Sequence, residues 1–194
     1  MRILGLLAPM ALLALTGCSL GSSAPPPTVL PGSAVTRTLE QDGRFISLVG
    51  PRRPHGEPFL GIPNTNYYTL RSLIDTRSGE TAHQLYVEDS YFGGKREWNA
   101  AQDKAGTKLR FVPISLNEIT CNPGCSYAEE FAATLPETLL RASQQGLAVT
   151  FTAKSGDRMT ITVAAEQLQQ QLAAVDAARA KTPAAAAAAA ARLP

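Results

Sequence analysis

The chain has 194 residues, 44% of them hydrophobic, and its 18 Lys and Arg against 16 Asp and Glu give a formal net charge of +2. This length is typical of a single domain, and this hydrophobic fraction is ordinary for a globular core. Because basic and acidic residues are interspersed and form no basic stripe, the composition excludes the charged surface typical of nucleic-acid-binding proteins, and we expect no nucleic-acid partner.

An apolar run starts almost at the first residue and ends at a cysteine. Arg2 is the only charge before Arg37, residues 3–15 are almost entirely apolar, and Leu15-Thr16-Gly17-Cys18 closes the run. The run is shorter than the about 20 apolar residues that a transmembrane helix needs, and it has the length of a signal-peptide core. The closing motif resembles the lipobox of bacterial lipoproteins, L-[AST]-[GA]-C. The alternative is an ordinary secretory signal with a chance cysteine.

The resemblance implies that a signal peptidase cuts before Cys18 and that this cysteine carries acyl chains. Two or three chains anchor durably, because each buried methylene adds about 0.8 kcal/mol. Ser19 and Leu20 stand where an Asp would favour inner-membrane retention, so we expect a protein anchored in the cell outer membrane on its periplasmic face. Loss of residues 1–17 removes Arg2, and 17 basic against 16 acidic residues then leave a side-chain charge of +1.

Composition divides the chain into four parts. Residues 1–17 are the predicted signal peptide, residues 18–33 a flexible Pro/Ser/Gly linker, and residues 34–181 a single β-rich globular domain. Residues 182–194 follow as an alanine-rich tail that we expect to be disordered.

Alternating apolar and polar residues predict antiparallel hairpins through most of the domain. Asp42-Gly43 is a strong two-residue hairpin signal. Residues 147–163 alternate most regularly, with a turn at Ser155-Gly156-Asp157, and this pattern is typical of a sheet with one solvated face. The expected hairpins are 35–49, 67–91, 119–133 and 147–163, with further strands at 95–102 and 107–115.

Two helices complete the predicted fold. Thr134 and Glu137 have the spacing of a capping box, which predicts a short helix at about 135–145. Residues 164–180 predict a C-terminal helix whose apolar stripe leaves Gln171 outside it. The stripe consists of Leu168, Leu172 and Val175. The predicted fold class is therefore α+β, a mainly antiparallel and sandwich-like sheet with two helices.

Cys121 and Cys125 flank Asn122-Pro123-Gly124, and Pro-Gly suits the centre of a type II turn. An even pair in an oxidising compartment predicts a disulfide across this turn, worth about 2 kcal/mol or less on the chain-entropy model. A redox pair and half a metal site are the alternatives. Because zinc would need two more ligands and the only histidines are His55 and His83, we expect no metal.

The richest cluster of functional side chains lies at residues 86–98, around one Gly-Gly turn. Aromatic residues with polar groups are common at binding surfaces. The Pro/Gly-rich loop at residues 50–66 is locally basic and is long for a compact domain. We hypothesise that the turn and the loop form one recognition surface; the alternative is core aromatics, a solvated turn and a plain crossover loop. The candidate binding residues are Tyr91, Phe92, Arg96, Trp98, Arg52 and His55.

The chain has none of the common nucleophile or phosphate-binding motifs. A Ser–His–Asp set could be assembled from His83 with Asp75 or Asp89, but no spacing requires it. We therefore expect a non-enzymatic interaction or assembly module without catalytic residues or cofactor, with the membrane and another envelope protein as partners. The alternatives are an envelope hydrolase, which a deep pocket holding His83 beside a carboxylate and a hydroxyl would favour, and a small-ligand-binding lipoprotein that uses the aromatic turn.

Overall fold

The computed structural model describes residues 28–29, 34–41 and 43–184. The predicted signal peptide, Cys18 and most of the predicted linker and tail lie outside these residues. The strands are β1 (Thr28–Val29), β2 (Thr36–Glu40), β3 (Phe45–Val49), β4 (Arg53–Pro54), β5 (Tyr67–Asp75), β6 (Thr81–Phe92), β7 (Trp98–Asp103), β8 (Lys108–Thr120), β9 (Ser126–Leu135), β10 (Leu147–Ala153) and β11 (Arg158–Val163). The helices are α1 (Glu137–Ala142), α2 (Ala165–Arg179) and the short 3-10 turn η1 (Phe59–Gly61).

The strands form an 11-stranded sheet in the order β1-β2-β3-β5-β6-β9-β8-β7-β10-β11, with β4 added to β5. Each strand pairs antiparallel with its neighbours. β8 belongs to two parts of the sheet, because it pairs with β7 only at Lys108 and Leu109 and with β9 from Arg110 onward. The predicted α+β class, the sandwich-like character and all four hairpins are confirmed.

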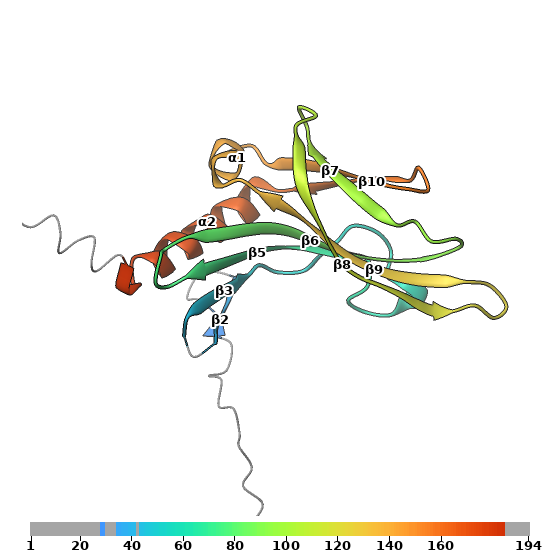
Figure 1. The fold of residues 1–194 in the computed structure, drawn as a ribbon, viewed down its shortest axis with the longest axis horizontal. Helices are drawn as coiled ribbons and strands as arrows, with labels where there is room; N and C mark the ends of the chain where they lie inside the picture. Colours follow the sequence, from blue (N-terminus) through green and yellow to red (C-terminus); the bar gives the residue numbers. More distant parts are fainter. Residues whose placement is uncertain (1–27, 30–33, 42, 185–194) are drawn as a thin grey trace, which may run out of the picture.

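The sheet folds over itself at β8, and the larger core lies between its two parts. In Figure 1, β7 and β10 lie above the strip formed by β5, β6 and β9. The rings of Phe131 on β9 and Phe151 on β10 lie 5.0 Å apart across this interior, and both side chains are almost fully buried. Burial of such aromatic side chains is the main stabilising contribution of a core.

The alternation in residues 147–163 has the expected cause. β10 shows strictly alternating burial, with Leu147, Val149, Phe151 and Ala153 buried and the residues between them partly exposed. β11 buries Ile161 and Val163 in the same way. Period-2 alternation appears here because one face of this hairpin covers the core and the other faces solvent.

α2 covers the other end of the sheet. Its Ala174, Val175 and Ala178 pack in a second apolar cluster with residues of β3 and β5. Gln171, which the sequence places outside the apolar stripe, is 2% exposed. Its Nε2 donates to the Leu48 carbonyl at 3.1 Å and to Ser72 Oγ at 2.9 Å, so this amide satisfies polar groups beneath the helix.

Two boundaries differ from the sequence-based expectation. β1 pairs with β2 through Thr28 and Val29, so strand pairing starts inside the predicted linker. The capping box at Thr134 is not formed: β9 continues to Leu135, Pro136 is the N-cap of α1, and Glu137 is its first residue. Thr134 stays in extended conformation because it lies in register between Gln84 of β6 and Arg110 of β8, and the Glu137 carboxylate binds other side chains.

Glu137 joins α1, α2 and β6. Its carboxylate accepts hydrogen bonds from Arg179 Nη2 at 2.7 Å and from Arg141 Nε at 2.8 Å, and it lies 3.5 Å from His83 Nε2. These bonds, that from Arg179 first, lower the pKa of Glu137 to about 2. Burial lowers the pKa of His83, which therefore stays neutral near neutral pH.

The Glu137 contacts predict a pH-dependent contribution to stability. Because the folded pKa lies below that of the unfolded chain, the contribution is complete above about pH 5 and is lost as the pH falls toward 2. Glu137→Gln should lower the free energy of unfolding by about 2 kcal/mol at neutral pH and by much less near pH 2. Urea titrations across this range measure the difference, with Glu80→Gln in an exposed turn as the matched control. A penalty that is the same at every pH would contradict the prediction.

Candidate functional site

Two buried carboxylates face each other across β6 and β9. Asp89 and Glu129 are opposite each other in the ladder and are 3% and 4% exposed. Like charges in directly opposed positions destabilise a sheet, and buried carboxylates need hydrogen-bond donors. The segment that leads from β6 into β7 supplies both a positive charge and the hydrogen-bond donors that these two carboxylates need.

Asp89 is bound by two side chains from this segment. Its Oδ2 accepts a hydrogen bond from Arg96 Nη1 at 2.7 Å and from the indole N–H of Trp98 at 2.9 Å. The guanidinium group compensates the buried charge, and the indole fixes the orientation of the carboxylate. Trp98 is only 6% exposed, and its ring lies 5.3 Å from that of Phe131.

Glu129 is bound mainly by the main chain of the same segment. Its two oxygens accept the N–H groups of Glu97 at 2.9 Å and of Trp98 at 3.1 Å. The hydroxyl of Tyr91 also donates to this carboxylate. Burial and the neighbouring carboxylates raise the pKa of Tyr91, so the hydroxyl keeps its proton.

Arg96 completes the arrangement at its exposed side. Its guanidinium lies 4.1 Å from the centre of the Tyr91 ring, its main-chain N–H donates to the Tyr91 hydroxyl at 2.9 Å, and its Nε lies 3.8 Å from Asp157. The side chain is still 29% exposed. A cation stacked on an aromatic ring and held by a buried carboxylate is well ordered before any partner arrives.

The basic loop at residues 50–66 is tied to the same end of β6. His55 Nε2 lies 2.7 Å from the Glu88 carbonyl, and the Glu88 carboxylate accepts the N–H of Asn66 and the hydroxyl of Ser90. Asn66 in turn accepts the N–H of Ser90 at 2.7 Å. These contacts place the loop against β6 and close one wall of a cleft.

The cleft has a volume of about 310 Å³ and lies between this loop, the residue 91–98 turn and the β10–β11 hairpin. Four of the predicted residues line it: Tyr91, Arg96, Trp98 and His55. Asp89, which orients Arg96 and Trp98, belongs to the cluster at residues 86–98 that the sequence singled out, but the sequence did not point to the other orienting residues. Asp157 comes from a hairpin remote in sequence, and Glu129 from β9.

The other two candidates lie elsewhere. Phe92 is 61% exposed, and its ring lies 4.8 Å from that of Phe59. The guanidinium of Arg52 lies 4.5 Å from the centre of the Tyr67 ring. Neither side chain lines the cleft. The cleft therefore combines part of the predicted turn with part of the predicted loop.

The structure places His83 with neither Asp75 nor Asp89. Its Nδ1 lies 2.9 Å from Ser72 Oγ, and its Nε2 faces Glu137. A histidine does lie between a hydroxyl and a carboxylate, but His83 and Ser72 are each 2% exposed. No lining residue of the cleft belongs to this group, and Ser72 Oγ accepts a hydrogen bond from Gln171 of α2, so the group links α2 to the sheet.

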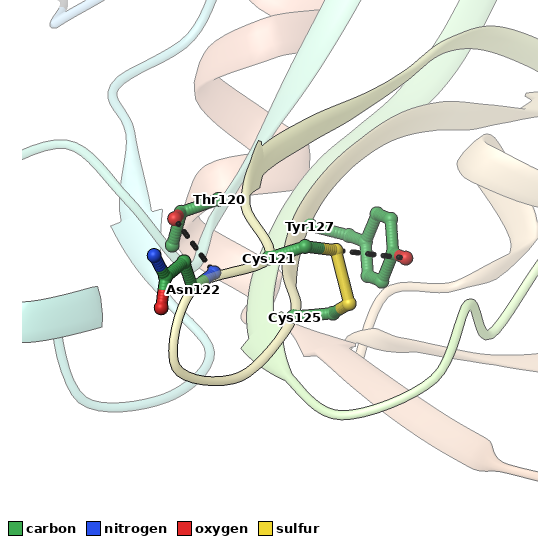
Figure 2. Close-up of a disulfide and its surroundings, with 5 residues drawn as sticks. All are labelled: Thr120, Cys121, Asn122, Cys125 and Tyr127. Atoms are coloured by element: carbon green, nitrogen blue, oxygen red, sulfur yellow. Dashed lines mark hydrogen bonds between the residues drawn. A yellow bond between two sulfur atoms is a disulfide. The ribbon is translucent and has the colours of Figure 1, made fainter.

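The predicted disulfide joins Cys121 and Cys125 at the tip of the β8–β9 hairpin (Figure 2). A type II turn needs positive φ at its second central residue, and Gly124 has none, so the predicted turn type is wrong. Cys121 Sγ lies 3.8 Å from the hydroxyl of Tyr127, whose ring lies 6.0 Å from that of Tyr91.

No family model, curated protein or solved structure matches this chain. In the described part of the chain, no group of three or more His, Cys, Asp and Glu side chains has an arrangement that could hold a metal ion. No helix among residues 28–29, 34–41 and 43–184 is long and apolar enough to span a membrane.

Removing the charge of Asp89 tests whether this network holds the site. Asp89→Asn leaves the Arg96 guanidinium without its buried counter-ion and should cost about 3 kcal/mol in the free energy of unfolding. Asp157→Asn is the matched control, because Asp157 is 51% exposed and its loss should cost less than about 0.5 kcal/mol. Urea unfolding followed by the fluorescence of Trp98, the one tryptophan of the chain, measures both. Equal effects would show that the buried pair does not organise the site.

Proposed function

We propose that this protein is a lipid-anchored protein of the cell envelope that acts as a non-enzymatic interaction module facing the periplasm. The proposed anchor is Cys18 in the cell outer membrane. The proposed recognition surface is the cleft lined by His55, Arg96 and Tyr91, where another envelope protein would bind.

The observation that carries this proposal is the preorganised Arg96. Its guanidinium is fixed on Tyr91 and Asp89 but remains partly exposed at the mouth of the cleft. Arginine and tyrosine held rigidly in a depression are typical of the residues that contribute most to protein interfaces. Arg158 on β11 and Asp157 line the same cleft, so its surface offers a partner charges of both signs.

The disulfide supports the proposed compartment. Structural disulfides persist in oxidising compartments such as the periplasm and are rare in the cytosol. The lipobox resemblance and the Cys121–Cys125 bridge are independent features of the chain, and both favour a location outside the cytoplasm.

Small-ligand binding is the second candidate function. A volume of about 310 Å³ lies at the lower end of the range of ligand pockets, about 300–1,000 Å³. An envelope hydrolase gains no support from the histidine that the sequence made its best candidate, because Ser72 and His83 are covered by α2 through Gln171.

The anchor is tested by labelling cells that express the full chain with an alkyne analogue of palmitate. We expect label on the native protein, and loss of both label and membrane association in Cys18→Ala. The double variant Cys121→Ala/Cys125→Ala is the matched control, because it removes two cysteines and should keep its label. Label that persists in Cys18→Ala would overturn the lipid anchor.

The cleft is tested by photo-crosslinking in intact cells, with a photoreactive phenylalanine analogue in place of Arg158. We expect a crosslinked envelope protein that is not captured when the analogue replaces Arg77, an exposed residue on the β5–β6 turn. Arg96→Lys keeps the positive charge but removes the planar group that stacks on Tyr91, so capture should fall several-fold. Capture that is equal at both positions, or unaffected by Arg96→Lys, would refute this role of the cleft.

A further inference from the structure

The side of β8 that faces away from β9 is an open strand edge. β7 pairs with β8 only at Lys108 and Leu109, and no other described strand pairs with that side from Arg110 to Thr120. An unpaired strand edge offers main-chain N–H and C=O groups to an additional strand.

Exposed apolar side chains lie along this edge, and part of it is left open to pairing. Ile114, Leu116 and Ile119 are 45%, 38% and 49% exposed. Proteins usually protect an edge with charged residues, prolines or bulges. Between Phe111 and Asn117, β8 carries no charged residue. Pro113 and two register shifts, between Pro113 and Ser115 and between Glu118 and Thr120, leave residues 115–118 as the uninterrupted stretch.

A groove of about 590 Å³ runs along this edge, where β7 and β8 diverge. Its apolar lining includes Trp98, Phe111 and Phe131. The main-chain N–H groups at the start of β7 are already hydrogen-bonded, because those of Glu97 and Trp98 donate to the Glu129 carboxylate. A strand that enters the groove would therefore pair with β8.

The charges of the groove select the chemistry of that strand. Glu97, Glu129 and Glu130 line it against a single cation, Lys154, whose Nζ lies 3.2 Å from Glu97. Glu129 is buried on the inner face, while the neighbouring Glu130 binds Ser115 at 3.2 Å and is more exposed. Side chains of a strand alternate between faces. An apolar residue would thus enter the groove, and a basic residue beside it would meet Glu130.

We propose that residues 115–118 of β8 bind an extended segment of a partner protein by strand addition, and that the segment alternates apolar and basic residues. This edge is separate from the His55 cleft, and the inference does not rest on the function proposed for that cleft.

The test uses the full chain purified in detergent and a fluorescein-labelled peptide with blocked ends, Ser-Val-Lys-Val-Lys-Val-Ser. We expect saturable binding by fluorescence polarisation, and slower amide hydrogen exchange at residues 115–118 when the peptide is bound. A peptide with Glu in place of both lysines should bind at least about ten-fold more weakly, a difference of about 1.4 kcal/mol.

Two matched variants locate the site. Leu116→Lys places a charge on the edge and should weaken binding about ten-fold or more, a loss of about 1.4 kcal/mol or more. Leu73→Lys on β5 is the control, because Leu73 has the same 38% exposure and lies outside the groove, and it should bind as the wild type does. Trp98 fluorescence checks that both variants fold. Absence of binding, equal binding by Leu116→Lys, or protection confined to other strands would overturn the proposal.

Discussion

The opposition of Asp89 and Glu129 is the constraint on which the region around the cleft and the groove depends. Two carboxylates in register on neighbouring strands, each almost fully buried, repel each other unless donors reach both. The residue 96–98 segment supplies those donors: one guanidinium, one indole N–H and two main-chain N–H groups. These bonds fix the start of β7 over β6 and β9. Because β7 pairs with β8 only near its other end, the two strands diverge toward the start of β7.

That divergence produces both hollows of the site region. Trp98 lines the cleft on one side and the groove on the other. Its indole N–H donates a hydrogen bond to Asp89. A single buried side chain thus supports the proposed recognition cleft and the proposed strand-addition edge, and a change at position 98 would disturb both.

The sequence predicts what local pattern determines. The β10–β11 hairpin was predictable because each of its residues faces either the core or solvent, and Tyr91, Arg96 and Trp98 were grouped because one short turn connects them. What was missed depends on register between distant strands. Glu129 reaches the site only through the β6–β9 ladder, and Thr134 stays in β9 because two neighbouring strands pair with it. Gln171 is buried because it binds groups on β3 and β5 that no helical periodicity reveals.

An open edge with exposed apolar residues is a liability in a free-standing protein, and the surrounding structure limits it. Pro113 and the two register shifts leave only a short stretch for pairing, too short to template a long intermolecular sheet. The Cys121–Cys125 bridge closes one end of the β8–β9 hairpin, and pairing with β7 at Lys108 and Leu109 holds the other. A short edge forms few hydrogen bonds, so it binds weakly on its own. If a lipid anchor confines the protein and its partner to the same membrane, the raised local concentration makes weak pairing sufficient, and the shortness that prevents aggregation also keeps binding reversible.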